Sequence, residues 1–403
     1  MRDSKGTTGV AIIGIGESDL GVVPGKSSHA LYTQAINAAI ADVGLKKSDL
    51  DGLITLDSYV TKRARHAISL AQYAGFDSAS MCWISTSMHG SLSSSGVALL
   101  EAAMAIRSGL CEYVVVAGAD NLYSWGRQAG ITKLAENRDP EFETPFGPLI
   151  VACYALVAQR YMADYGATEE DFAEIAVAER AWANLHPNAH MHGAPLTKAD
   201  VLASPMVASP FRRFNAPLIS DGGCALVLAS AERAQDFGDR AITLLGSERS
   251  YGTGAGIVVD DMGMLPSTYA LREGSELVTK RVFASTGLSV AEIDVFFQYD
   301  SFPIVTLLFL EAAGLCGKGE AAAFVREGRL APGGGLPWTT HGGLHSYCHP
   351  GVNGGAYHLI EMVRQLRGEA GLRQVQGAEL ALMQGYGANM GAYNATILKR
   401  GLP

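Results

Sequence analysis

A chain of 403 residues is too long for one ordinary hydrophobic core, so its length predicts two domains or one duplicated domain. Hydrophobic residues make up 48% of the chain and charged residues 18%, which supplies a large core and excludes an intrinsically disordered protein. The net charge of −9, without any run of Lys or Arg, argues against nucleic acid or an anionic membrane as a partner.

The cysteine pattern is typical of a reducing compartment. The sequence contains no CxxC motif, and most of its cysteines lie in apolar stretches, which predicts buried thiols and no disulfide framework. The first apolar run is too short for a signal peptide, and the longest later run is too short to span a bilayer. We therefore expect a cytoplasmic protein. The six cysteines are Cys82, Cys111, Cys153, Cys224, Cys316 and Cys348.

Helices and strands alternate along the first 120 residues. Apolar runs bounded by glycine predict strands, helical spacing of small apolar residues predicts helices, and "YVVVAGAD" reads as a strand buried on both faces. This alternation is typical of an α/β protein with layered sheets and helices. The predicted order is strand 9–18, helix 29–45, strand 51–55, helix 96–110 and strand 113–120.

The second half of the sequence repeats the first. "GLKKSDLDGLIT" at 44–55 aligns without gaps with "GLSVAEIDVFFQ" at 287–298, so that Asp51 coincides with Asp294. Further on, a helix followed by a strand occurs in the same order in both halves. These echoes predict an internal duplication.

The domain boundaries follow from this duplication. We predict an N-terminal half at 1–245 and a C-terminal half at 246–403. Residues 121–215 are rich in helix formers and aromatic residues, and we interpret them as an insertion in the N-terminal half that caps the site.

Four stretches carry a family resemblance that covers nearly the whole chain. They resemble the thiolases of the sterol carrier protein x type, and "FQYDSF" with "HGGLHSYCHPGVNGG" are the more specific motifs. The resemblance implies the α/β thiolase fold, a duplicated five-layer α/β/α/β/α architecture, usually dimeric and acting on acyl-CoA. The stretches are 165–191, 201–230, 297–316 and 341–355.

The chain departs from this family at both catalytic cysteines. The family's nucleophile would fall at or beside Leu92, yet no cysteine lies between Cys82 and Cys111. The second family cysteine would fall at Met383 or Gln384. A nearby serine could replace the nucleophile if a base lay beside it, although serines before a helix are also good caps. The candidate serines are Ser91, Ser93 and Ser94.

Two tyrosines stand at the remaining motif positions. Tyr299 occupies the place where the family has His or Asn, and Tyr347 precedes His349 of the "CHP" corner by two residues. In this the chain is similar to the thiolase-like aldolases of steroid side-chain degradation, which lack the cysteines and are thought to use paired tyrosines.

The resemblance implies retro-aldol cleavage of a bulky β-hydroxyacyl-CoA to a ketone or aldehyde and a short acyl-CoA, such as propionyl-CoA or acetyl-CoA. Tyr299, Tyr347 and His349 are the expected catalytic residues, Asp300, His345 and Gly385 the supporting ones, and Arg212, Arg213, Gly343 and Ser91 the substrate-binding ones.

Two other functions stay open at this point. The chain could be a thiolase or acyltransferase with a displaced Ser or Cys348 nucleophile, or a non-catalytic subunit that binds acyl-CoA or lipid. Histidine clusters around His190 and His345 lack the spacing and carboxylates of a metal site, so we expect no metal and no cofactor besides the substrate's coenzyme A. Related aldolases work with a small OB-fold, zinc-ribbon protein that binds acyl-CoA. The resemblance therefore implies a homodimer that joins two such subunits in a heterotetramer.

Overall fold

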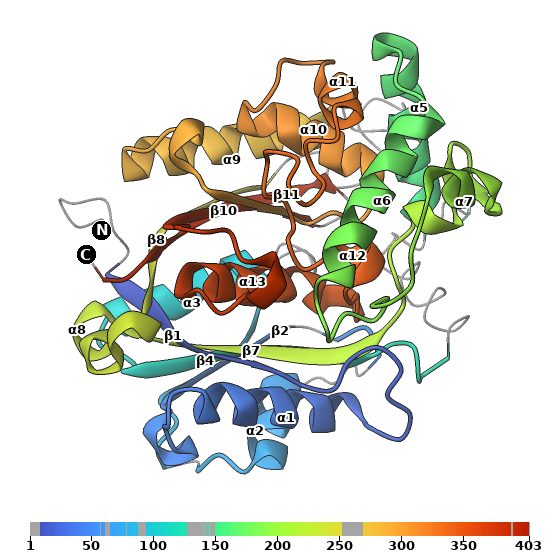
Figure 1. The fold of residues 1–403 in the computed structure, drawn as a ribbon. Coiled ribbons are helices and arrows are strands. Elements are labelled where there is room, and N and C mark those ends of the chain that lie inside the picture. The colour runs from blue at the N-terminus through green and yellow to red at the C-terminus, as the bar shows by residue number, and fades with distance from the viewer. Residues whose placement is uncertain are drawn as a thin grey trace.

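The computed structural model of the protein describes residues 9–56, 58–60, 65–77, 79–87, 94–126, 141, 145, 150–251, 269–387 and 390–402. Its elements stack in five layers, in which two helical layers cover the outside and a third helical layer lies between two halves of a sheet (Figure 1). The predicted duplicated α/β architecture is confirmed. The outer helices are α1 (Ser28–Ala41) and α2 (His66–Ala74) on one side and α9 (Ala270–Thr286) and α10 (Pro303–Ala313) on the other; the central ones are α3 (Ser94–Arg107) and α13 (Gly354–Arg367).

One mixed sheet of nine strands runs through both halves in the order β3-β2-β4-β7-β1-β8-β11-β10-β9. The two halves join where β1 pairs antiparallel with β8. The strands are β1 (Val10–Glu17), β2 (Gly52–Leu56), β3 (Trp83–Ser87), β4 (Tyr113–Asn121), β7 (Asp221–Ser230), β8 (Ile242–Tyr251), β9 (Val295–Gln298), β10 (Leu380–Gly387) and β11 (Ala392–Arg400).

The strand order shows the duplication directly. From the outer edge inward, β2-β4-β7-β1 of the N-terminal half corresponds to β9-β10-β11-β8 of the C-terminal half. Even the edge strand β3 has a counterpart, because Trp338 forms a parallel bridge to Phe296 on the outer side of β9. Each half therefore repeats one sheet topology.

The aligned aspartates explain why the sequence repeat is visible. Asp51 accepts hydrogen bonds from the backbone N–H groups of Glu112 and Tyr113, at 2.7 and 2.9 Å, where β4 begins. Asp294 accepts equivalent bonds from Glu379 and Leu380, at 2.8 and 2.9 Å, where β10 begins. In each half one carboxylate ties the start of a parallel strand to its neighbour, so the residue type recurs.

Three apolar clusters fill the spaces between the layers. The middle one draws side chains from both half-sheets and from α3 and α13, and the outer two lie beneath α1 and α2 and beneath α9 and α10. Alternation along β10 separates them, because Leu382 belongs to an outer cluster and Met383 to the middle one. Burial on both faces accounts for the continuous apolar runs in these strands.

The predicted insertion at 121–215 contains α5 (Ile150–Tyr165), α6 (Glu169–Asn184) and α7 (Lys198–Ala203), with the short strands β5 (Met206–Ala208) and β6 (Phe211–Arg212). These elements gather at one end of the layers (Figure 1), where α6 contacts α12 (Gly343–Ser346). The predicted division at residue 245 falls inside β8, and the domain limits stay a prediction. Among the described residues, the remaining α-helices are α8 (Ala231–Ala234) and α11 (Ala321–Arg326). No helix in the described ranges is both long and apolar enough to cross a membrane.

Candidate functional site

The candidate site lies where β9 ends and the glycine-rich segment 341–355 turns back. Tyr299 follows β9 directly, and its backbone N–H donates a 2.9 Å hydrogen bond to Gln384 of the neighbouring strand β10. The carboxyl ends of parallel strands are where α/β proteins place their sites. The turn then brings His349 and the first residue of α13, Gly354, beside Tyr299.

Tyr299 and His349 form a hydrogen-bonded pair. The Tyr299 hydroxyl lies 2.9 Å from Nε2 of His349, and Nδ1 of the same ring lies 2.9 Å from the carbonyl oxygen of Leu218. A carbonyl can only accept, so Nδ1 carries the proton and Nε2 is the acceptor. The phenol therefore donates to the imidazole, and the imidazole is ready to take its proton.

Burial sets the charge states of the pair. Removal from water lowers the pKa of His349 to about 4, although the Leu218 carbonyl acts in the opposite direction. Burial likewise raises the pKa of Tyr299 well above its ordinary value, and the nearby phenols of Tyr386 and Tyr59 add to the shift. At neutral pH both groups are uncharged. Tyr299 can therefore give its proton to His349 only as it takes one from a substrate hydroxyl, so that no free tyrosinate forms.

At Gly343 the backbone of this turn requires glycine. It has a φ of +63°, and a Cβ there would lie 1.7 Å from Oδ2 of Asp300. That oxygen instead accepts a 3.0 Å hydrogen bond from the backbone N–H of Leu344. The glycine lets the carboxylate that follows Tyr299 reach the backbone of the turn that leads to His349.

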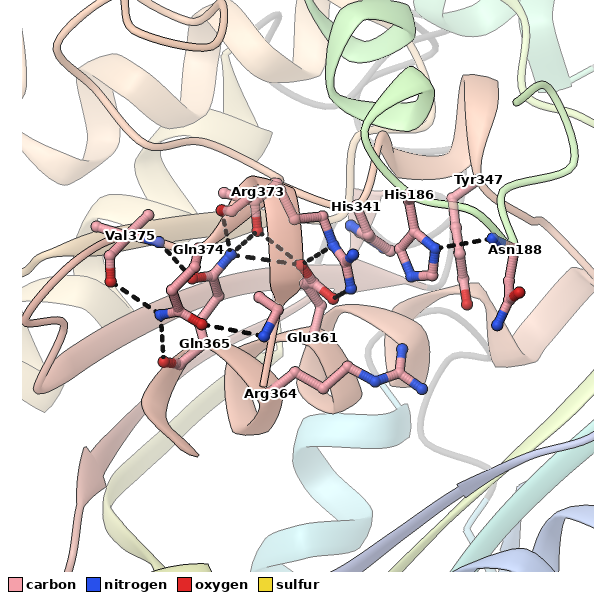
Figure 2. Close-up of polar contacts among 12 residues, drawn as sticks. His186, Asn188, His341, Tyr347, Glu361, Arg364, Gln365, Arg373, Gln374 and Val375 are labelled. Atoms are coloured by element: carbon pink, nitrogen blue, oxygen red, sulfur yellow. Dashed lines mark hydrogen bonds and ion pairs between the residues drawn. The ribbon is translucent and has the colours of Figure 1, made fainter. Parts of the chain in front are cut away.

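Tyr347 does not join the pair. Its hydroxyl donates a 2.6 Å hydrogen bond to Glu17, whose other oxygen forms an ion pair with Arg364. Its ring lies against His186 and His341, with centroid distances of 4.6 and 4.9 Å (Figure 2). The expected arrangement of two phenols around one carbonyl is therefore not what the structure brings together.

The other predicted supporting and binding residues are mostly engaged elsewhere. Arg212 bonds to Glu169 at 2.7 Å and to a backbone carbonyl at 3.1 Å, whereas Arg213 is exposed. A Cβ on Gly385 would lie 2.1 Å from Oδ1 of Asn394, so this glycine lets β11 approach β10. Ser91 lies outside the described residues, as do Leu92 and Ser93.

Cys348 does not have the surroundings of a nucleophile. Its thiol is buried, and burial raises its pKa to about 12. A reactive thiol needs a lowered pKa and access to substrate. This finding weighs against the displaced-cysteine interpretation.

Several side chains at the site were not anticipated. The Tyr386 hydroxyl is bonded to Ser301, and its ring meets Tyr299 edge-on at 5.5 Å. From the N-terminal half, Tyr59 follows β2 and packs on Gly351 of the turn. A signal existed for both tyrosines, because each stands near the end of a predicted strand, and the structure shows that β2 and β10 each run parallel to a neighbour.

The comparisons agree with the fold and the motifs. A protein-family model described as "Thiolase C-terminal domain-like" matches residues 266–400. The chain is 34% identical to the 17-hydroxy-3-oxo-4-pregnene-20-carboxyl-CoA lyase of Mycobacterium tuberculosis, over 93% of this chain and 95% of that one. It is also 34% identical to a steroid side-chain-cleaving aldolase of Thermomonospora curvata, over 89% and 90% of the two chains.

A solved structure described as Ltp2-ChsH2(DUF35) aldolase superposes with a TM-score of 0.81 at 30% identity, and 98% of each chain is covered. Identity above 30% over nearly the full length shows the family. The chain belongs to the thiolase superfamily, and within it the chain is similar to the steroid side-chain aldolases.

Proposed function

We propose that this protein cleaves a carbon–carbon bond of a bulky β-hydroxyacyl-CoA by a retro-aldol reaction. The observation that carries the proposal is the buried, uncharged Tyr299–His349 pair, in which the phenol donates to an imidazole that can accept its proton. This reaction needs proton transfer and hydrogen-bond donors for the enolate but no nucleophile, whereas acyl transfer needs a nucleophile. The lost cysteines of the family are then dispensable.

The reaction balances with one proton. As the substrate's β-hydroxyl gives its proton to Tyr299, Tyr299 gives its own to Nε2 of His349. The Cα–Cβ bond breaks, its electron pair forms the enolate of the shorter acyl-CoA, and the β-carbon leaves as a ketone or aldehyde. The pair then returns the proton to the enolate carbon. General acid–base help of this kind is worth about 10²- to 10⁴-fold in rate.

The enolate oxygen needs hydrogen-bond donors placed in advance, each worth about 3 to 4 kcal/mol. We assign this task to the first turn of α13, because the first N–H groups of a helix have no partner within the helix. The N–H of Gly354 itself donates to the carbonyl oxygen of Gly351, so the donors are the N–H groups that follow it. Gly354 brings this backbone close to the pair: a Cβ there would lie 2.9 Å from the His349 ring and 3.4 Å from the Tyr299 ring. We assign the thioester oxygen to this backbone.

A CoA thioester of a steroid side chain is the substrate class we propose, since one relative named above is a 17-hydroxy-3-oxo-4-pregnene-20-carboxyl-CoA lyase and the other a steroid side-chain-cleaving aldolase. Arg212 is taken up by Glu169, which leaves Arg213 and a second subunit to contact the CoA phosphates. The similar aldolase structure includes a DUF35 protein. A small OB-fold, zinc-ribbon acyl-CoA-binding subunit is accordingly the partner we propose.

A homodimer completes the proposed assembly. The edge strand β3 pairs only with β2 among the described strands, and its Trp83 is 42% exposed. A groove of about 450 Å³ beside it is lined in part by Trp83, Met104 and Leu110, all of them partly exposed. An edge strand whose outer side has no neighbouring strand, flanked by apolar side chains, is a site for a second copy of the chain. Two copies, each with a partner subunit, give the heterotetramer.

Product analysis tests the proposal. The purified complex is given a steroid β-hydroxyacyl-CoA, and we expect one carbonyl product and one short acyl-CoA per turnover without consumption of free CoA. Activity that depends strictly on added CoA would show a thiolase instead. Binding without turnover on any β-hydroxyacyl-CoA would show a carrier.

A further inference from the structure

Two chain segments hold the Tyr299–His349 pair, and they meet at a buried cluster of two carboxylates and an imidazole. One segment is 299–301 and the other is 342–349. Within the cluster, one ligand-type atom from each of Glu179, Asp300 and His345 lies within 4.8 Å of the others. All three side chains are buried, and Glu179 comes from α6 of the predicted insertion.

Hydrogen bonds fix the orientation of the imidazole in this cluster. Nε2 of His345 lies 3.2 Å from the carbonyl oxygen of Ser301, and Nδ1 contacts Oε2 of Glu179. Because the carbonyl only accepts, Nε2 carries the proton, and an uncharged ring then presents a lone pair at Nδ1. Glu179 must supply the hydrogen of the bond to Nδ1.

The second carboxylate keeps the negative charge. Asp300 accepts from the backbone N–H of Leu344 at 3.0 Å, and its Oδ1 lies 3.1 Å from Nε2 of His358. His358 contacts Nε2 of His341 through its own Nδ1, at 3.0 Å. The Leu344 N–H donates to Asp300, whereas Oε2 of Glu179 needs a hydrogen to bond the lone pair at Nδ1 of His345, so Asp300 is the charged member and Glu179 the neutral one.

The charges around Glu179 agree with this assignment. Burial raises the pKa of Glu179 well above 4.5, and the Asp300 carboxylate adds to the increase, whereas Arg180 on the same helix opposes it. Burial also lowers the pKa of His345, so that its ring stays uncharged. For Asp300, burial alone would raise the pKa, but the contacts with His358, His345 and Glu179 together outweigh it. With one proton on Glu179 and one on Nε2 of His345, the buried cluster carries a single negative charge, on Asp300.

We infer that Glu179 is a positioning residue for the Tyr299–His349 pair: a neutral carboxylic acid, buried with Asp300 and His345, that joins the two segments carrying the pair. It acts through Asp300, which follows Tyr299, and through His345, which lies four residues before His349. Through Glu179, helix α6 of the insertion contacts the turn that carries His345 and His349. The role in turnover rests on the proposed function, whereas the neutral state of Glu179 does not.

Two substitutions separate this role from the alternatives. Glu179→Gln keeps the shape and a donor for His345 while removing the ionisable proton, so it should keep kcat and KM close to those of the wild-type complex. Glu179→Ala removes the link and should lower kcat by on the order of 10²-fold with little change in KM, because small displacements of reacting groups are that costly. Glu179→Gln as damaging as Glu179→Ala would overturn the inference, and so would full activity of Glu179→Ala.

A second readout does not depend on activity. A carboxyl that holds its proton more tightly in the folded than in the unfolded protein makes the folded state less stable as pH rises above the unfolded pKa. The Tm of the wild-type protein should therefore fall relative to that of Glu179→Gln as pH rises from about 5 to about 8. Parallel Tm curves would overturn the inference even if Glu179→Ala does not fold.

Stoichiometric zinc in the wild-type protein that is lost in Glu179→Gln would also overturn it, because the cluster would then be a metal site. A wild-type complex without cleavage activity would refute the proposed function and leave the Tm comparison valid.

Discussion

Tyr299→Phe removes one oxygen atom from the site and should separate chemistry from stability. The lost bond is the 2.9 Å contact to Nε2 of His349, and this acceptor is buried. Loss of a buried neutral partner costs about 1 to 3 kcal/mol of folding free energy. The loss in kcat should be larger, about 10²- to 10⁴-fold, because the proton path from substrate to imidazole is cut.

A matched control isolates the catalytic part of this effect. Tyr161 is also fully buried and its hydroxyl is bonded to a carboxylate, that of Glu311 on α10, away from the turn that holds the pair. Tyr161→Phe should lose stability by a similar amount in urea unfolding and keep its kcat. Steady-state turnover and unfolding midpoints are measured on both variants. Equal kcat values for Tyr299→Phe and the wild-type complex would refute the reasoning.

Four further outcomes follow from the geometry. Tyr347→Phe should lower kcat less than Tyr299→Phe, because its hydroxyl serves Glu17; equal losses in steady-state assays would restore the two-phenol mechanism. Because the pKa of His349 lies at about 4 in the folded protein and near 6.5 when unfolded, stability present above pH 6.5 should be lost as pH falls toward 4, by at most about 3 kcal/mol. Denaturant titrations of wild type and His349→Gln at several pH values measure this difference, and an identical pH dependence would contradict it. Gly343→Ala should destabilise the protein and abolish turnover, while Gly328→Ala, which has a similar φ of +71° and open space, should cost only about 1 kcal/mol of unfolding free energy. Cys348→Ala should keep wild-type turnover and iodoacetamide should not inhibit; inhibition that Cys348→Ala removes would indicate a thiol mechanism.

The duplicated fold was predictable because its signals are local. A glycine that ends a helix and an aspartate that ties two strands recur at equal spacing, and Gly44 and Gly287 indeed share a φ of about +70°. Such residues keep their identity in both halves because backbone geometry demands it. The positions of Tyr299 and His349 at the candidate site were also predictable, since Tyr299 follows a strand and His349 stands in a glycine-rich turn.

The orientation of Tyr347 could not be predicted from spacing. The expectation that Tyr347 and His349 share one pocket came from their motif positions, two residues apart, in the family that the chain resembles. The chain instead leaves the short helix α12 at Tyr347, and the side chain turns toward Glu17 at the end of β1.

Glu179 was missed for a different reason. An acidic residue on a charged amphipathic helix is usually solvated, but the tertiary packing of α6, against α12 among others, buries Glu179. The tautomer of His349 likewise depends on the Leu218 carbonyl, a backbone group that carries no sequence signal.

The most direct test is a crystal structure of the complex with a slowly reacting β-hydroxyacyl-CoA analogue bound. The account predicts that the Tyr299 hydroxyl lies within hydrogen-bonding distance of the β-oxygen, about 2.6 to 3.2 Å, while keeping its contact with His349. A β-oxygen held instead by Tyr347 and Glu17, or an acyl group joined covalently to the protein, would contradict it.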